Sequence, residues 1–181
     1  MNHLMIDNET MGTGADAVLI SIGAIAFNPD TGWVDDHGGI ELFPTFQDQL
    51  DAKRVVCPDT FMWWLKQSDE ARRGVTSARR ASVAGCMESL RDYWNRMNCK
   101  FVWSHGATFD VPQIESMMEG ERIPWRFYNI RDTRTLWHLC PIDKPEATKH
   151  TALADAVEQA TRTLAAWQKI KLVAGPEIPL L

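Results

Sequence analysis

Leu4-Met5-Ile6-Asp7-Asn8-Glu9-Thr10 is the stretch of this sequence that decides the fold. Its apolar first half predicts a strand buried on both faces, as in the centre of a sheet. Side chains at positions i and i+2 of a strand leave the same face, so Asp7 and Glu9 are expected to project together from the strand's end. Convergent carboxylates are the ligands that hard cations such as Mg²⁺ prefer.

The residues that follow predict two more strands. Val18–Phe27 is long and apolar enough for a second, central strand. Asn28-Pro29-Asp30-Thr31-Gly32 has the composition of a turn and predicts a hairpin into a third strand near Gly39–Phe43. Three adjacent antiparallel strands follow from this order.

The rest of the chain alternates between helical and strand patterns. Residues 44–98 favour helices, with Ala84–Met97 the clearest amphipathic segment. Phe101–Ser104 predicts a buried strand, and a helical crossover would make it a parallel neighbour of the first strand. Tyr128–Ile130 predicts a short fifth strand, and His150–Lys171 a long final helix.

Two later segments carry further candidate functional groups. Asp110 follows Phe109 and precedes a helical pattern over Val111–Met118. Taken alone, this pair is equally typical of a core aromatic beside a helix N-cap, because Asp is a favoured cap residue. His150 and Asp155 stand at the start of the final helical segment, where a lone histidine is usually an ordinary residue. The order and spacing of all three segments favour a metal-dependent nuclease.

Three motifs resemble those of the DEDD exonucleases. Asp7-Asn8-Glu9-Thr10-Met11-Gly12 is similar to the first motif, Ser104–Asp110 to the second, which ends in Phe-Asp, and His150–Asp155 to the third. A histidine five residues before the last aspartate marks the DEDDh, or DnaQ-like, branch. Within it, Phe61–Gln67 and Arg131–Arg134 look most like compact phage and prophage exonucleases related to the catalytic domain of exonuclease VIII.

The resemblance implies the fold and the extent of the domain. The expected class is α/β, a ribonuclease H-like fold with a mixed five-stranded sheet flanked by helices. Three of its strands would be antiparallel and the others parallel. One exonuclease domain is expected over residues 1–173, followed by an extended tail over residues 174–181, whose glycine and prolines disfavour helix.

The resemblance also implies the activity: 3′–5′ hydrolysis of single-stranded nucleic acid from a free 3′ end, releasing nucleoside 5′-monophosphates. Asp7, Glu9, Asp110 and Asp155 would hold two Mg²⁺ ions, with Mn²⁺ able to substitute. Such ions lie about 3.5–4 Å apart in two-metal sites. His150 would serve as the general base. Five residues turn about 140° around a helix, so His150 is expected at the frayed helix start or in the loop before it.

Substrate contacts are expected from side chains near these motifs. Thr10 and Met11 match positions that touch the terminal nucleotide in relatives. Trp63 and Trp64 are adjacent, so one of them, with Trp64 preferred, is expected to stack on a base while the other packs inward or against a second molecule. Gln67, one helical turn further on, is within reach of the scissile phosphate.

The second motif departs from the family pattern. Its aspartate often has an asparagine four positions earlier, and Gly106 stands there in this sequence. The carboxylates are intact, and the departure puts one supporting contact of the family in question. His105, beside Gly106, is a further candidate for substrate contact and the next candidate for the base.

Composition agrees with a single, soluble, cytoplasmic enzyme. The chain has 181 residues, 45% of them hydrophobic and 24% charged, with no apolar run of membrane-spanning length and no signal peptide. Four scattered cysteines favour reduced thiols over a zinc site. The net charge of −5 does not exclude a nucleic-acid substrate, because bound cations reverse the local sign and the basic residues between Lys53 and Arg80 are candidates for backbone contacts.

Several alternatives stay open at this stage. The phage-like resemblance favours DNA, and an exoribonuclease or oligoribonuclease of the same branch acting on RNA is the alternative. A nucleic-acid-binding module without catalysis is expected to lack one of the five catalytic residues, and a phosphatase would lack the three-motif order. The eight tryptophans suffice either for a homodimer interface or for the core.

Overall fold

A computed structural model describes residues 1–118, 123–143 and 151–174 of the chain. A mixed sheet lies at its centre, with strands in the order β3-β2-β1-β5-β6 and β4 paired to β2 as well. β1 runs antiparallel to β2 and parallel to β5. The strands are β1 (Asn2–Thr10), β2 (Leu19–Asn28), β3 (Trp33–Val34), β4 (Ile40–Leu42), β5 (Cys99–Ser104) and β6 (Ile130–Asp132).

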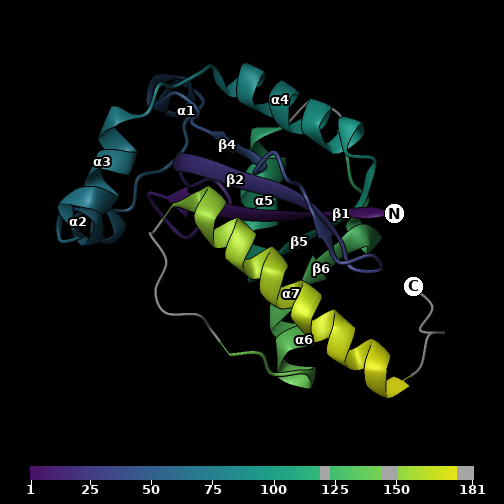
Figure 1. Cartoon of the computed structure of the whole chain (residues 1–181). Coiled ribbons are helices and arrows are strands. Elements are labelled where there is room, and N and C mark those ends of the chain that lie inside the picture. Colours follow the sequence, from purple (N-terminus) through teal and green to yellow (C-terminus); the bar gives the residue numbers. More distant parts are fainter. Residues whose placement is uncertain (119–122, 144–150, 175–181) are drawn as a thin grey trace.

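Helices cover both faces of this sheet (Figure 1). On one face, α4 (Val83–Arg96) and α5 (Ala107–Met117) pack on the apolar side chains of the central strands. On the other face, α7 (Ala152–Ala174) lies across β1 and β2 beside α6 (Thr133–Leu139). The remaining helical elements are α1 (Phe46–Asp51), α2 (Pro58–Leu65), α3 (Asp69–Ser77) and the 3₁₀ turn η1 (Phe127–Asn129). Among the described residues, none of the helices is long and apolar enough to cross a membrane.

The alternation of β1 distributes its side chains between the two faces. Leu4 and Ile6 are buried in the cluster under α4 and α5, whereas Met5 is buried in the cluster under α7. Continuing the period of two sends Asp7 and Glu9 toward α7 and Asn8 toward α5. The order of residues in this one strand therefore sorts the polar groups of the site between two helices.

The observed elements follow the predicted order, with small shifts. β1, β2, β5 and the hairpin turn are confirmed, and Gly32 closes that turn with a positive φ of 77° and a bond from its N–H to the carbonyl of Asn28. The sheet has six strands instead of the expected five, because the two-residue β3 pairs with β2 before β4 does. Phe127–Asn129 forms a 3₁₀ turn, so β6 begins at Ile130, the last residue of the predicted fifth strand.

The start of α7 lies directly on β2 at Gly23. A Cβ atom added at Gly23 would lie 2.2 Å from the carbonyl carbon of Ala152, far inside van der Waals contact. Gly23 pairs with Asp7 on one side and with Glu41 on the other. Because Gly23 has no side chain, the first turn of α7 packs directly on the sheet between Asp7 and Glu41.

We predict that Gly23→Ala displaces the first turn of α7. Overpacking of this kind costs about 1–3 kcal/mol of folding stability. Because Asp155, a predicted metal ligand, lies on that turn, the affinity for Mn²⁺, measured by isothermal titration calorimetry, should fall by about 10–100-fold, as for other groups that orient metal ligands. Gly85→Ala on α4 is the control, since only the rotatable Ser82 hydroxyl lies within 4 Å of the new methyl group. Unchanged Mn²⁺ affinity in Gly23→Ala would contradict the prediction.

Candidate active site

Three of the predicted metal ligands meet where β1 ends under the first turn of α7. Asp7, Glu9 and Asp155 each offer a carboxylate oxygen, and these three atoms all lie within 4.8 Å of one another. All three side chains are half-buried. The strand period brings Asp7 and Glu9 to the α7 side, and the close approach at Gly23 brings Asp155 down to them.

Asp110, the fourth predicted ligand, is not one of these three converging carboxylates and is held in the opposite layer by Asn8. The Asn8 backbone N–H donates to Oδ1 of Asp110 at 3.1 Å, and its side-chain amide donates to the Asp110 carbonyl and to Gln113 Oε1. Gly106, with φ of 108°, is the N-cap of α5, and Asp110 lies inside the first turn. The alternative that Asp110 is merely the helix cap is therefore wrong.

The electrostatics of the site show that these carboxylates repel one another. Burial, followed by the charge of Asp110, raises the pKa of Asp7 well above its usual range. Burial and the charges of Asp155 and Glu41 raise the pKa of Glu9 to about 7. Burial also raises the pKa of Asp110 to about 6, although the Asn8 amide and the Arg134 guanidinium oppose the rise. An uncompensated cluster of this kind is unfavourable near neutral pH.

This arrangement fits a divalent cation. Half-buried carboxylate oxygens from two elements converge on one point, and oxygen is the ligand that Mg²⁺ and Mn²⁺ prefer. A bound cation would also offset the repulsion that raises the pKa values of Asp7 and Glu9. Among the described residues, this is the one cluster of acidic, histidine or cysteine side chains close enough for a shared metal ion.

Gln159 is a supporting residue that the sequence motifs did not indicate. It lies one helical turn after Asp155 on α7 and is buried. Its side-chain amide donates to Oδ1 of Asp7 at 2.7 Å. The bond holds one Asp7 oxygen and leaves the other for a cation. The i, i+4 spacing from Asp155 was the signal for this contact, but only the docked helix shows its partner.

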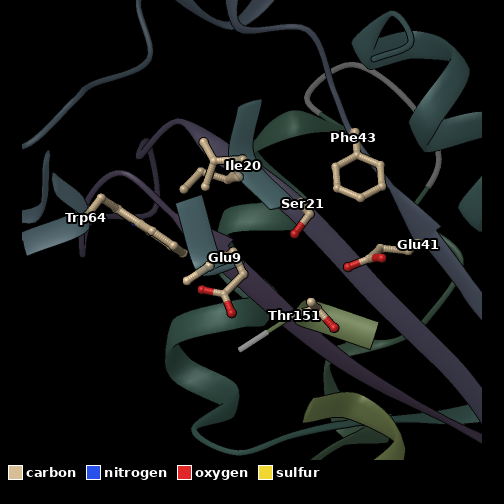
Figure 2. A pocket seen from close by; sticks show the side chains of 9 residues that line it. Glu9, Ile20, Ser21, Glu41, Phe43, Trp64 and Thr151 are labelled. Carbon is tan, nitrogen blue, oxygen red and sulfur yellow. The ribbon is translucent and has the colours of Figure 1, made fainter. Parts of the chain in front are cut away.

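A pocket opens beside Glu9 (Figure 2). Figure 2 shows the side chains of Glu9, Ser21, Glu41 and Thr151 around the same space, with Trp64 and Phe43 on its sides. The complete lining also includes apolar groups from β2 and α3, namely Ile20, Ala71 and Val75. One part of the pocket is therefore polar and lies against the candidate metal ligand Glu9, while the other part is apolar.

The two adjacent tryptophans have different surroundings. Trp64 is buried, and its indole N–H donates to the carbonyl of Thr10 at 2.9 Å while the ring lines the pocket. Trp63 is half exposed on the outer side of α2. Trp64 is thus the tryptophan that packs inward, and the face that it offers a base is the one bordering the pocket. Gln67 bonds back to the carbonyl of Trp63 at 3.0 Å.

Thr10 and Met11 are tied into the loop after β1. The Thr10 hydroxyl donates to the carbonyl of Gly12 at 2.6 Å, and the Met11 backbone bonds to Val18 and Cys57. Neither residue lines the pocket. These bonds leave the half-buried Met11 side chain, and not the Thr10 hydroxyl, for contact with another molecule.

His105 and Gly106 lie at the junction of β5 and α5. The His105 ring stacks on Trp137 with centroids 4.8 Å apart, and Nδ1 shares a hydrogen bond with the Thr133 hydroxyl at 2.9 Å. A Cβ at Gly106 would lie 2.8 Å from the Arg134 guanidinium. At this position, where the family often has an asparagine, a side chain would therefore contact Arg134 of α6.

Two members of the predicted basic stretch have structural roles. Arg54 donates to the carbonyls of Ala15 and Ala17 and to the Ser116 hydroxyl. Arg80 donates to the carbonyls of Ile20 and Pro44. Both guanidinium groups are thus occupied within the fold. His150, the predicted base, lies outside the described residues, as do the residues 175–181 of the predicted tail.

Comparison with known proteins identifies the family. Residues 2–167 match the model of the Rv2179c-like 3′–5′ exoribonuclease domain. The chain belongs to this family. It is therefore a nuclease of the DnaQ-like 3′–5′ exonuclease superfamily, as the three motifs predicted, and enzymes of this family use divalent metal ions.

Relatives of this Rv2179c-like domain agree with the assignment. An exodeoxyribonuclease of Enterobacteria phage T4 is 29% identical over 160 residues, which cover 75% of this chain and 70% of the relative. The fold is shared with product-bound exonuclease I (TM-score 0.60, 15% identity, 94% of this chain) and with cell-death related nuclease 4, CRN-4 (TM-score 0.58, 10% identity, 95% of this chain). The chain spans 43% of the exonuclease I chain and 64% of the CRN-4 chain.

We predict that Asp7→Asn stabilises the metal-free protein at pH 8 while abolishing its activity. The amide keeps the shape and the bond from Gln159 but removes a buried charge. Each pH unit by which a pKa is raised corresponds to about 1.4 kcal/mol. A gain of that order raises the melting temperature of a chain this size by about 2–6 °C. Calorimetry in a metal chelator measures the change.

The raised pKa of Asp7 also determines how the stability gain of Asp7→Asn changes with pH. A carboxyl with a raised pKa in the folded state costs stability above that pKa, and the stability returns as pH falls through it. The gain in Asp7→Asn should therefore shrink as the pH is lowered, and Mg²⁺ should stabilise the wild type more than the variant. Asp92→Asn, at an exposed position on α4, is the control. A variant less stable than the wild type at pH 8 without metal would contradict the prediction.

Proposed function

We propose that the protein is a 3′–5′ exonuclease that removes nucleoside 5′-monophosphates from single-stranded nucleic acid by two-metal-ion catalysis. The observation that carries this proposal is the convergence of Asp7, Glu9 and Asp155 beside a pocket whose polar end is formed by Glu9 itself. A terminal nucleotide in that pocket would have its phosphate next to the metal ligands.

The four carboxylates would bind two different ions. Asp7, Glu9 and Asp155 would hold the ion on the side of the attacking water, and Asp7 with Asp110 the ion on the side of the leaving group. When bound, two such ions, Mg²⁺ or Mn²⁺, lower the pKa of water and neutralise charge on the phosphate. Asn8 and Gln159 fix the orientation of Asp110 and Asp7 from opposite faces of β1.

We assign proton transfer to His150. The third motif places it before α7, which begins at Ala152 and carries Asp155 in its first turn. An imidazole has an ordinary pKa of about 6.5, so its neutral form is available to accept a proton from water near pH 7. Arg134, whose charge favours the ionised form of Asp110, would help to keep this ligand deprotonated.

Preference for a free 3′-hydroxyl follows from the charges in the pocket. Glu9 and Glu41 both face its polar end, and each carboxylate accepts hydrogen bonds from a hydroxyl but repels a phosphate. A strand that continued past the terminal nucleotide would bring a phosphate against these groups. The pocket therefore favours a chain end over an internal position.

We predict that only substrates with a free 3′-hydroxyl are degraded. A linear single strand labelled at its 3′-terminal nucleotide should release labelled mononucleotide with Mg²⁺ or Mn²⁺. The same strand with a 3′-phosphate, or closed into a circle, should react at least about 100-fold more slowly, since one misplaced group in an active site costs a factor of this order. Circular strands cut as fast as linear ones would show an endonuclease. Binding without turnover of any strand would favour the non-catalytic module, and turnover of mononucleotides alone a phosphatase.

We predict that His150→Ala lowers the rate constant for cleavage by about 10²–10⁴-fold, the usual contribution of a positioned general base. In the wild type, the single-turnover rate at saturating Mg²⁺ should rise with pH through the histidine pKa and then level off, because only neutral imidazole accepts a proton. His150→Ala should lose this rise. His105→Ala is the matched control, and a pH profile that changes in His105→Ala but not in His150→Ala would assign the base to His105.

A further inference from the structure

We propose that Arg134 forms a subsite for the phosphate next to the scissile one, on the part of the strand that remains after the terminal nucleotide is released. This retained strand would be bound through its charge at that phosphate. The inference rests on the proposed function and adds a second point at which the same active site holds its substrate.

The order of the strands gives the direction in which a substrate would cross the site. The pocket is lined in part by β2 and β4, the predicted metal ligands Asp7 and Glu9 lie on β1, and β5 and β6 follow on the other side of β1. β1, β5 and β6 are parallel, so their carboxyl ends point to the same edge of the sheet. A strand whose last nucleotide occupies the pocket would pass the ligands on β1 and continue over the ends of β5 and β6.

Arg134 stands at this edge, two residues after the end of β6. Its side chain is exposed, and its guanidinium lies against Gly106, two residues after the end of β5. A Cβ atom at Gly106 would lie 2.8 Å from both Nη atoms and 2.9 Å from Cζ, so Gly106 faces the flat side of the guanidinium. The asparagine that the family often has at this position would fill the space that Arg134 occupies.

Asp132 fixes this arrangement by capping two helices. Its Oδ2 accepts the Ala107 N–H of α5 at 2.9 Å, and its Oδ1 accepts the Arg134 N–H of α6 at 2.8 Å. Because Asp110 lies in the first turn of α5, this one carboxylate sets the position of Arg134 relative to Asp110. The guanidinium is accordingly close enough to favour the ionised form of Asp110.

The Arg134 guanidinium has donors that the fold does not use. Arg131 donates to two backbone carbonyls, and Arg162 lies 3.8 Å from the centre of the Trp137 ring and donates to another carbonyl. The Arg134 side chain, by contrast, makes no hydrogen bond and no ion pair with any residue that the structure describes. A guanidinium can bind a phosphate through two parallel hydrogen bonds, so an exposed arginine with unused donors suits this anion.

The exposure of Arg134 assigns it to the neighbouring phosphate and not to the scissile one. In the proposed function, the scissile phosphate lies at the carboxylates, of which Asp7, Glu9 and Asp155 are half-buried and Asp110 is only 3% exposed. Arg134 lies at the surface on the side of Asp110, where the leaving group and the retained strand would be. Each phosphate of that strand carries one negative charge.

The test removes the charge of this one phosphate. Two single strands of one sequence are labelled at the 3′-terminal nucleotide, and one of them carries an uncharged methylphosphonate at the second linkage from the 3′ end. The scissile linkage is a normal phosphodiester in both. The kcat/KM for release of the terminal nucleotide with Mg²⁺ is measured for each strand, as DNA and as RNA, and compared in the kind that is cleaved faster. The wild type should favour the fully charged strand by at least about tenfold, the factor expected for one charge-assisted hydrogen bond.

Variants of Arg134 should remove this preference. Arg134→Gln should bring the ratio close to one, mainly by lowering kcat/KM for the fully charged strand. Arg134→Lys should retain part of the preference, because an ammonium group keeps the charge but not the paired donors. Arg126→Gln, the same change at an exposed arginine that precedes β6, is the matched control and should keep the wild-type ratio.

The ratio separates phosphate binding from an effect on Asp110. Because the charge of Arg134 lowers the pKa of Asp110, its removal could also slow the reaction, but this effect would slow both strands equally and keep the ratio. A ratio that Arg134→Gln leaves unchanged, or a wild-type ratio near one, would overturn the inference while leaving the exonuclease intact. Failure of the wild type to release nucleotides from the 3′ end of the unmodified strands would instead overturn the proposed function.

Discussion

The close contact between Gly23 and the first turn of α7 is the constraint on which the site depends. Asp155 and Gln159 reach Asp7 only because the helix backbone touches the strand, with no side chain between them. Any other residue at Gly23 would lift the helix and separate ligands that belong to opposite ends of the sequence. The absence of a side chain at Gly23 thus allows the backbone of α7 to contact the strand.

The same contact forces like charges together. Bringing Asp155 to Asp7 and Glu9 raises the pKa of the latter two, and Asp110 adds to the repulsion from the other layer. Surrounding bonds from Asn8 and Gln159 hold the carboxylates in this unfavourable arrangement. Stability is given up at the point where a divalent cation would recover it, as is common at sites built for charge stabilisation.

The alternation of side chains along a strand gives neighbouring residues different roles. Asp7, Asn8 and Glu9 are consecutive, yet Asn8 supports Asp110 under α5 while the two acids face α7. Further along the same face, Ser21 and Glu41 extend the polar surface from the metal ligands into the pocket. The acidic residues of β1 and the polar end of the pocket are therefore parts of one continuous row across β1, β2 and β4.

The sequence by itself determined the order of elements and indicated the carboxylates that converge in the candidate site, because strand alternation, turn residues and motif spacing are local properties that periodicity records. It predicted β1, β2 and the shared face of Asp7 and Glu9, but it missed β3 and placed β6 two residues too early, because such short elements carry little periodic signal. It did not indicate Gln159, Glu41 or Ser21, and it left open which tryptophan packs inward. Only the tertiary structure decided these points, because each depends on which surfaces meet when α7 and α2 dock on the sheet, and such long-range contacts are not encoded in local spacing.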